Sequence, residues 1–261
     1  MGLIRRRVAP DSGKNTAFSY LIACDFGQVS DYTAIAVTRR RLVPAGEPYA
    51  APVTYRHHHS GMRSRRGLEH RQDVQAHYDL IRLDRPPLRT PYTNIARGIV
   101  NLLREFYAAH TGSDGYRDGE RVYVGLAIDE GGVGVAVKDV LVSEWQKSIT
   151  RGEPHVNFLP VTLHGGTSVT RDQNFVHAPK RDVVGAGIVT YQSGRLHVGK
   201  LRYRDVLEDE LSNYRLKQNI ATAHVAFEPL REGQHDDLLF ATCLGVWAWE
   251  FVYRPKAFVR L

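Results

Sequence analysis

Residues 20–37 read Tyr20-Leu-Ile-Ala-Cys-Asp25-Phe-Gly27-Gln-Val-Ser-Asp31-Tyr-Thr-Ala-Ile-Ala-Val37. An apolar run ends on Asp25, a glycine turn follows, and a second apolar run begins at Ala34. This pattern predicts a hairpin whose first strand carries Asp25 to the edge of a sheet. Because an unpaired carboxylate is costly to desolvate, an acid at the end of a buried strand needs a partner. Asp25 could also simply cap a turn.

The composition is that of a globular domain. The chain has 261 residues, of which 43% are hydrophobic, so it can bury a substantial core. It contains no apolar run long enough to span a membrane, and residues 1–7 lack the apolar stretch of a signal peptide. Cys24 and Cys243 both lie in apolar segments, which favours buried, reduced thiols. We therefore expect a soluble cytoplasmic protein with no membrane partner.

Basic residues outnumber acidic ones and gather in one segment. The formal net charge is +7, which favours a polyanionic partner. Between residues 56 and 71, Glu69 is the one acid. His57 to His59 do not fit a zinc site well, because consecutive strand residues point to opposite faces. The segment instead predicts a phosphate-facing surface that includes Arg56, Arg63, Arg65 and Arg66.

Hydrophobic periodicity indicates an α/β protein. We expect residues 1–18 to be a flexible basic leader and residues 19–261 to be one domain. A helix should open at Thr90-Pro91, and residues 165–179 should form a polar loop. The expected strands are 19–24, 33–42 and 53–58, which form an antiparallel meander, then 121–128, 156–163, 195–198 and 224–227. Further helices are expected at 135–146, 180–192, 201–217 and 238–251.

Three acidic motifs share one context. Asp25 and Asp129 each end an apolar strand, and Asp236-Asp237 precede an apolar helix. If the first and fourth strands are neighbours, as in a ribonuclease H-type sheet, their carboxyl ends meet at one edge, where sites collect in α/β folds. Crowded carboxylates repel one another unless cations neutralise them, and oxygen ligands suit Mg²⁺ or Mn²⁺. Two such ions about 3.5–4 Å apart can assist displacement at phosphorus.

The ordered set of motifs resembles the nuclease domain of phage large terminase subunits, in the ribonuclease H/retroviral integrase-like superfamily. The matching stretches, between about residues 19 and 252, are Ala23-Cys-Asp25-Phe-Gly-Gln-Val-Ser-Asp31-Tyr-Thr-Ala-Ile, Ile128-Asp129-Glu-Gly-Gly132-Val-Gly134, Pro179-Lys180-Arg-Asp-Val-Val, Gln192-Ser-Gly194-Arg-Leu and His235-Asp236-Asp237-Leu. The resemblance implies a mixed central sheet of five or more strands flanked by helices.

The resemblance also implies roles for individual residues. Asp25 would bridge two Mg²⁺ or Mn²⁺ ions, Asp129 would be a second ligand, and Asp236 with Asp237 would close the site. Auxiliary positions are Asp31, His235 and Lys180, and Lys180 with Arg181 would contact DNA. The implied activity is two-metal endonuclease cleavage of double-stranded DNA during genome packaging, in the host cytoplasm. Implied partners are a separate packaging ATPase, a small terminase subunit or a portal.

Two departures from the family pattern stand out. No G-x-x-x-x-G-K-[ST] loop occurs in the chain, so it has no packaging ATPase of that kind. Glu130 stands where the family often has a small or hydroxyl residue, and we expect it to be an exposed acid rather than an extra ligand.

Other functions share part of this pattern. A non-catalytic DNA-binding module of the same fold and a resolvase- or transposase-type nuclease remain open. An actin-like or sugar-kinase-like ATPase also begins with Asp-x-Gly, but it needs two such domains and a second phosphate loop. Metal-dependent cleavage separates the nucleases from a binding module.

Overall fold

The computed structural model describes residues 19–27, 31–56, 64–110, 116–117, 120–121, 123–149, 156–172, 175–219, 224–229, 235–254 and 258–260. The leader expected at 1–18 lies outside these residues, so the division into leader and domain stays a prediction.

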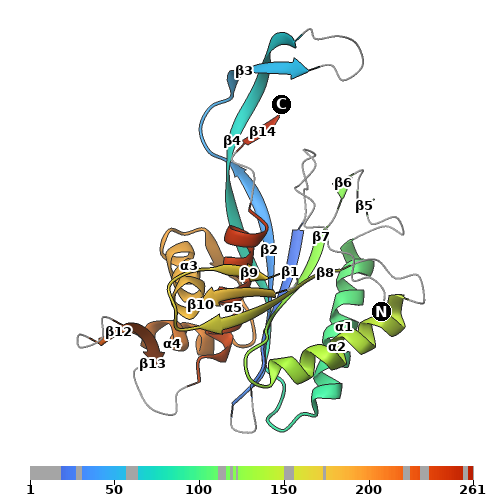
Figure 1. The fold of residues 1–261 in the computed structure, drawn as a ribbon, viewed down its shortest axis with the longest axis vertical. Coiled ribbons are helices and arrows are strands. Elements are labelled where there is room, and N and C mark those ends of the chain that lie inside the picture. The colour runs from blue at the N-terminus through green and yellow to red at the C-terminus, as the bar shows by residue number, and fades with distance from the viewer. Residues whose placement is uncertain are drawn as a thin grey trace.

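A ten-stranded mixed sheet runs through the molecule in the order β11-β4-β2-β1-β7-β8-β10-β9, with β3 and β14 also paired to β4 (Figure 1). The antiparallel part contains β1, β2 and β4, whereas β1, β7, β8 and β10 are parallel. The expected α/β fold with a ribonuclease H-like strand arrangement is therefore confirmed. The strands are β1 Ser19–Asp25, β2 Ala34–Pro44, β3 Tyr49–Arg56, β4 Ser64–Asp84, β7 Tyr123–Asp129, β8 Asn157–His164, β9 Thr170–Asp172, β10 Phe175–Pro179, β11 Leu196–Val198 and β14 Phe258–Arg260.

The register of β1 decides where its acid lies. Asp25 is opposite Ala34 of β2, and Cys24 is opposite Ile128 of the parallel strand β7. Asp25 follows Cys24 and Asp129 follows Ile128, so the two acids end neighbouring strands at the same edge.

Helices cover both faces of the sheet, which gives three layers (Figure 1). Side chains of β1 alternate between them: Leu21 and Ala23 join the core with α3 and α5, whereas Ile22 and Cys24 join the core with α1 and α2. Helix α4 packs on α5. The helices are α1 Tyr92–His110, α2 Gly134–Ile149, α3 Lys180–Gln192, α4 Arg204–Asn213 and α5 Asp237–Trp247, which continues as a π-helical turn over Ala248–Val252.

Helix α5 is the central helix of its layer, and all of its residues are buried. A Cβ on Gly187 of α3 would lie 2.3 Å from the Sγ of Cys243, so glycine lets α3 approach α5 closely. Both Cys243 and Cys24 are free and buried, as expected. No helix in the described part of the chain is long and apolar enough to cross a membrane.

The third strand of the meander was predicted wrongly. Beside β2 lies β4, a 21-residue strand that includes the second half of the basic segment, and not the expected strand at 53–58. The latter is β3, which pairs only with the first part of β4. There β4 leaves the body of the sheet and, with β3 on one side and β14 on the other, forms a projecting arm (Figure 1).

Two further expectations are corrected. The loop expected at 165–179 contains β9 and β10, and Val176 and Ala178 are buried because β10 pairs with β8. The helix expected at 201–217 ends at Asn213, and the chain continues as β12 Tyr214–Asn219, which pairs with β13 His224–Pro229. A second small hairpin joins β5 Tyr116–Arg117 to β6 Glu120–Arg121.

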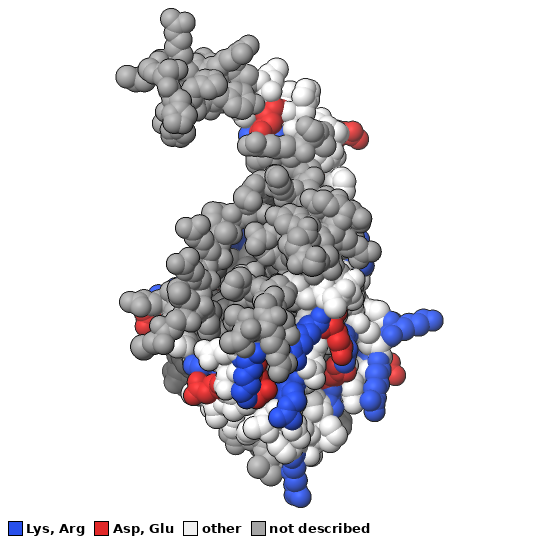
Figure 2. Space-filling view, turned by 90° about the vertical axis from the view of Figure 1, so that its right-hand side faces the viewer, with Lys and Arg blue, Asp and Glu red and all other residues white. Residues whose placement is uncertain are grey.

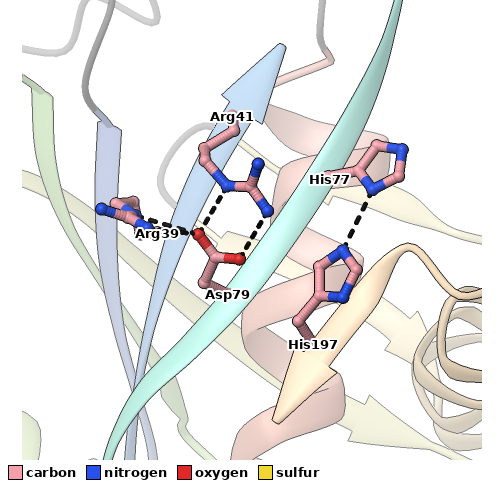
Figure 3. A network of polar contacts seen from close by, with 5 residues as sticks. All are labelled: Arg39, Arg41, His77, Asp79 and His197. Atoms are coloured by element: carbon pink, nitrogen blue, oxygen red, sulfur yellow. Dashed lines mark hydrogen bonds and ion pairs between the residues drawn. The ribbon is translucent and has the colours of Figure 1, made fainter. Parts of the chain in front are cut away.

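A cluster of two arginines around one aspartate lies away from the acidic edge, on β2 and β4 (Figure 3). Arg39 Nη2 lies 2.7 Å from Asp79 Oδ2, and Arg41 donates to both carboxylate oxygens, at 2.6 and 2.8 Å. Beside the cluster, His77 Nδ1 lies 3.1 Å from His197 Nε2. Burial raises the pKa of Asp79, but the hydrogen bonds from Arg41 and Arg39 outweigh it and leave this pKa below its ordinary value.

Candidate functional site

Asp25 and Asp129 reach the acidic edge from parallel strands, and a glycine turn shapes the second position. The Gly131 N–H donates to Asp129 Oδ1 at 2.8 Å, which fixes that carboxylate. Gly132 has a φ of 55°, a left-handed conformation that favours glycine. A Cβ on Gly134 would lie 2.1 Å from the Asp129 carbonyl oxygen, so only glycine lets α2 begin this close to the strand.

The paired acids enter the edge from α5. Asp237 is the first residue of the helix and is 6% exposed. Asp236 occupies the N-cap position but makes no side-chain capping hydrogen bond. The Asp236 carboxylate is therefore not used as a cap.

These acids surround a cleft of about 320 Å³. His235 bridges two acidic segments, because its Nδ1 lies 3.9 Å from Asp31 Oδ1 and 3.8 Å from Asp237 Oδ2. Asp129 does not line this cleft, although its charge acts on Asp25. The lining comes from β1, the turn after β7 and the start of α5: Asp25, Phe26, Gly27, Asp31, Gly131, Gly132, Val133, His235, Asp236 and Asp237.

Burial and mutual repulsion make the carboxylates weak acids. Burial raises the pKa of Asp25 well above its ordinary value, and the charges of Asp129, Asp237 and Asp236 raise it further. Burial also raises the pKa of Asp129 and of Asp236. The pKa of Asp237 rises to about 6, again through burial, although Arg85 and His235 oppose the rise. The site therefore holds more negative charge than its own cations balance.

Lys180 is a cation that acts on several of these acids. It begins α3, its side chain is exposed, and its Nζ lies 3.9 Å from the ring centroid of Phe240 on α5. Its charge lowers the pKa of Asp25, Asp129 and Asp236, so it faces the same edge. Arg181 instead lies 3.3 Å from Asp182, its neighbour in the helix.

Sequence reasoning missed Arg85 and Glu210. Arg85 Nη2 lies 2.5 Å from Glu210 Oε1 and 3.5 Å from Asp237 Oδ2, and its guanidinium lies over the ring of Tyr32 at 4.8 Å. Glu210 comes from α4, and its Oε2 accepts the Leu239 N–H of α5 at 2.8 Å. No local signal predicts this pair, because its members are 125 residues apart.

Glu130 is not the exposed acid that the sequence suggested. It is 7% exposed and forms an ion pair with Lys138 of α2, whose Nζ also lies 4.8 Å from the Phe175 ring. The Glu130 N–H donates to the Val161 carbonyl and so extends the β7–β8 ladder. This bond carries Glu130 beneath α2, where the carboxylate fixes the helix to the sheet.

The described part of the basic segment lies in the projecting arm, far from the acidic edge (Figure 1). Arg56 is in β3, and Arg65 and Arg66 are in β4, while Arg63 lies outside the described residues. At about 3.3 Å per residue, Arg65 and Arg66 are about 60 Å along the strand from its end beside the cleft. Figure 2 shows Lys and Arg interspersed with Asp and Glu over the described part of the α1 and α2 side.

The donors at the acidic edge suit a hard cation, although they do not form a finished ligand shell. Among the described residues, no three Asp, Glu, His or Cys side chains converge closely enough to hold a metal ion. Yet buried Asp237 Oδ2 accepts no hydrogen bond from the described residues. Carboxylate oxygens with unbalanced charge fit Mg²⁺ or Mn²⁺, which Asp25, Asp129 and Asp237 would hold.

No family model matches the chain, and no curated protein matches it. Among solved structures, the chain is similar to the large terminase nuclease from thermophilic phage G20c, with 14% identity over 92% of this chain and 89% of that one and a TM-score of 0.47. It is also similar to the Mn-soaked terminase nuclease domain of human cytomegalovirus, with 11% identity over 99% and 95% of the chains and a TM-score of 0.49. Likeness at this level concerns the fold alone.

Proposed function

We propose that the chain is a metal-dependent endonuclease that hydrolyses phosphodiester bonds of double-stranded DNA, as terminase nucleases do during genome packaging. One observation carries the proposal: carboxylates from β1, β7 and α5 lie at one edge of the sheet, where burial and mutual repulsion raise their pKa values. An isolated cluster of this kind is costly to fold, and divalent cations would relieve the repulsion.

The residues of the edge then have distinct tasks. Asp25, on whose pKa the charges of both Asp129 and Asp237 act, is the carboxylate best placed to be shared by two ions. When bound, Mg²⁺ or Mn²⁺ would supply charge for the attacking and leaving oxygens of an in-line displacement. Lys180 lies where it can attract a DNA phosphate toward the acids. His235 lines the cleft between Asp31 and Asp237, where its ring can hydrogen-bond to a water or a phosphate oxygen.

A packaging role would need more than this nuclease domain. These 261 residues contain no phosphate-binding loop of the packaging ATPase, so the ATPase that moves DNA would lie outside them. A small terminase subunit and a portal are the other partners that such a role requires.

Supercoiled plasmid tests the proposal directly. The protein is incubated with plasmid and Mg²⁺, Mn²⁺ or EDTA, and nicked and linear products are followed with time. The proposal requires cleavage with either metal and none in EDTA. Cleavage in EDTA would rule out the metal-dependent reaction, and DNA binding without cleavage under any metal would favour a non-catalytic module.

A further inference from the structure

A buried ion pair between Arg85 and Glu210 lies beside Asp237. The side chains of Arg85 and Glu210 are 11% and 5% exposed, so both charges are largely removed from water. Breaking a buried pair is costly, because it leaves one charge without a partner. Arg85 is therefore held in place by Glu210 and is not free to follow Asp237.

Glu210 is itself fixed to the helix that carries Asp237. Its Oε2 accepts the Leu239 N–H in the first turn of α5, at 2.8 Å, while its Oε1 holds Arg85. The ring of Tyr32 packs against the Arg85 guanidinium, and the Tyr203 hydroxyl donates to the Arg85 carbonyl at 3.4 Å. The end of β4, helix α4 and the start of α5 thus meet at this guanidinium.

Arg85 approaches one oxygen of Asp237. Its Nη2 lies 3.5 Å from Oδ2, and His235 Nδ1 lies 3.8 Å from the same oxygen. Neither contact involves Oδ1. Neither contact is a hydrogen bond, and Oδ2 accepts none from the described residues, so the two groups orient the carboxylate by charge and leave Oδ2 able to bind a ligand.

We propose that Arg85, clamped by Glu210, is a positioning residue that orients Asp237 for a divalent cation. The inference rests on the proposed metal-dependent function and adds the part of the protein that supports the ligand. Partners behind a metal ligand commonly change metal affinity by about 10–100-fold when they are removed.

Charge alone predicts the opposite result, namely tighter metal binding when Arg85 is removed. Arg85 is a cation beside a cation site, so deleting it should strengthen metal binding if its charge is all that matters. A variant that removes one positive and one negative charge avoids this ambiguity. Arg85→Met with Glu210→Gln keeps the net charge, preserves an oxygen for the Leu239 N–H, and removes the clamp.

The matched control is the Arg195–Glu250 pair. It has the same Nη–Oε distance of 2.5 Å, and Glu250 also accepts a second hydrogen bond, from Tyr78, but the pair lies between β11 and the π-helical turn. Arg195→Met with Glu250→Gln makes the same chemical change away from the acidic edge. Circular dichroism of both double variants checks that they are folded.

The test is Mn²⁺ binding without DNA, followed by the electron paramagnetic resonance signal of free Mn²⁺. We expect binding about 10–100-fold weaker for the Arg85/Glu210 variant and unchanged for the Arg195/Glu250 variant. Unchanged or tighter binding by the first variant, or equal weakening in both, would overturn the positioning role while leaving the metal site standing. Absence of Mn²⁺ binding by the wild type would remove the proposed function and this inference together.

Discussion

Asp25 and Asp79 lie in the same sheet but in opposite electrostatic surroundings. Asp79 has two arginines on its carboxylate, which lower its pKa, whereas burial and the charges of three other aspartates raise the pKa of Asp25. The arginine cluster is complete within the chain (Figure 3). The acidic edge is not, because burial and the other aspartates hold the pKa of Asp25 well above its ordinary value even though Lys180 lowers it.

The difference separates a stabilising arrangement from a functional one. Ion pairs such as those of Asp79 favour the folded state, while repulsion at the acidic edge opposes it. A ligand that binds only the folded protein recovers this free energy on binding. Divalent cations should therefore stabilise the protein through the acidic edge and leave the arginine cluster unaffected.

The largest expected effect is on cleavage. Asp25→Asn, Asp129→Asn and Asp237→Asn should each lower the rate of plasmid cleavage by about 10²–10³-fold, since each loosens a group that supplies charge to the transition state. Asp79→Asn, measured beside them, should cleave at the wild-type rate. Equal loss in Asp79→Asn would mean that the two regions do not differ in function.

The second effect concerns DNA affinity and involves the arm. Reversing the charges of Arg63, Arg65 and Arg66 should weaken binding of a 40-base-pair duplex and reduce the slope of log affinity against log salt by about 0.9 for each lost phosphate contact. Binding of a duplex of about 10 base pairs should not change, because Arg65 and Arg66 are about 60 Å along β4 from its end beside the cleft. If both duplexes respond equally, or neither does, the arm is not a separate DNA contact. Asp25→Asn should bind both duplexes at least as well as wild type.

The third effect is on stability, where the same substitution should have opposite signs at Asp79 and at Asp25. Without metal at pH 7.5, Asp79→Asn should lower the free energy of unfolding by about 1 kcal/mol, or about 2–4 °C in melting temperature, because it loses charged hydrogen bonds that are partly exposed. Asp25→Asn should raise stability, since it removes a carboxylate that is repelled in the folded state. Thermal unfolding in EDTA measures both. If Asp25→Asn lowered the free energy of unfolding, the claim that the Asp25 charge destabilises the folded protein would be wrong.

The smallest effect is in how the stability changes caused by Asp25→Asn and Asp79→Asn depend on pH. The folded pKa of Asp25 is raised, so its penalty is absent below the unfolded value near 4 and grows as pH rises. The gain from Asp25→Asn should therefore shrink as pH falls toward 4. The folded pKa of Asp79 is lowered, so its contribution is present above about pH 4 and is lost as pH falls through the folded pKa. Urea unfolding between pH 3 and 8 measures the free energy of unfolding of both variants and of the wild type. If the stability changes of the two variants followed the same course with pH, the electrostatic surroundings of Asp25 and Asp79 would not differ.

Local patterns predicted the elements that deliver the acids. Apolar runs predicted β1, β2 and β7, and Pro179 and Gly194 bound α3 where the sequence placed it. The third strand was missed because polar residues dominate its pattern. In β4, buried Ala76, Tyr78 and Leu80 alternate with His77 and Asp79. Asp79 on the polar face of β4 pairs with Arg39 and Arg41 of β2. These arginines are about 40 residues away in the sequence, so the local pattern around β4 does not include them.

The acidic site was predictable to the same extent. Asp25, Asp129 and Asp237 each carry a local signal, because an acid at the end of an apolar strand or the start of an apolar helix is unusual. Arg85 and Glu210 carry no such signal, since they meet only when the end of β4, α4 and α5 pack together. The buried position of Glu130 likewise depends on its hydrogen bond to β8.

The most direct test of the central claim is a crystal of the wild-type protein soaked in Mn²⁺, with anomalous scattering recorded near the manganese edge. We expect two peaks about 3.5–4 Å apart at the acidic edge, with Asp25 between them and Asp129 and Asp237 on either side, and no peak at Asp79. A map without a peak at Asp25, or with manganese only elsewhere, would contradict the proposal that this edge is a divalent-cation site.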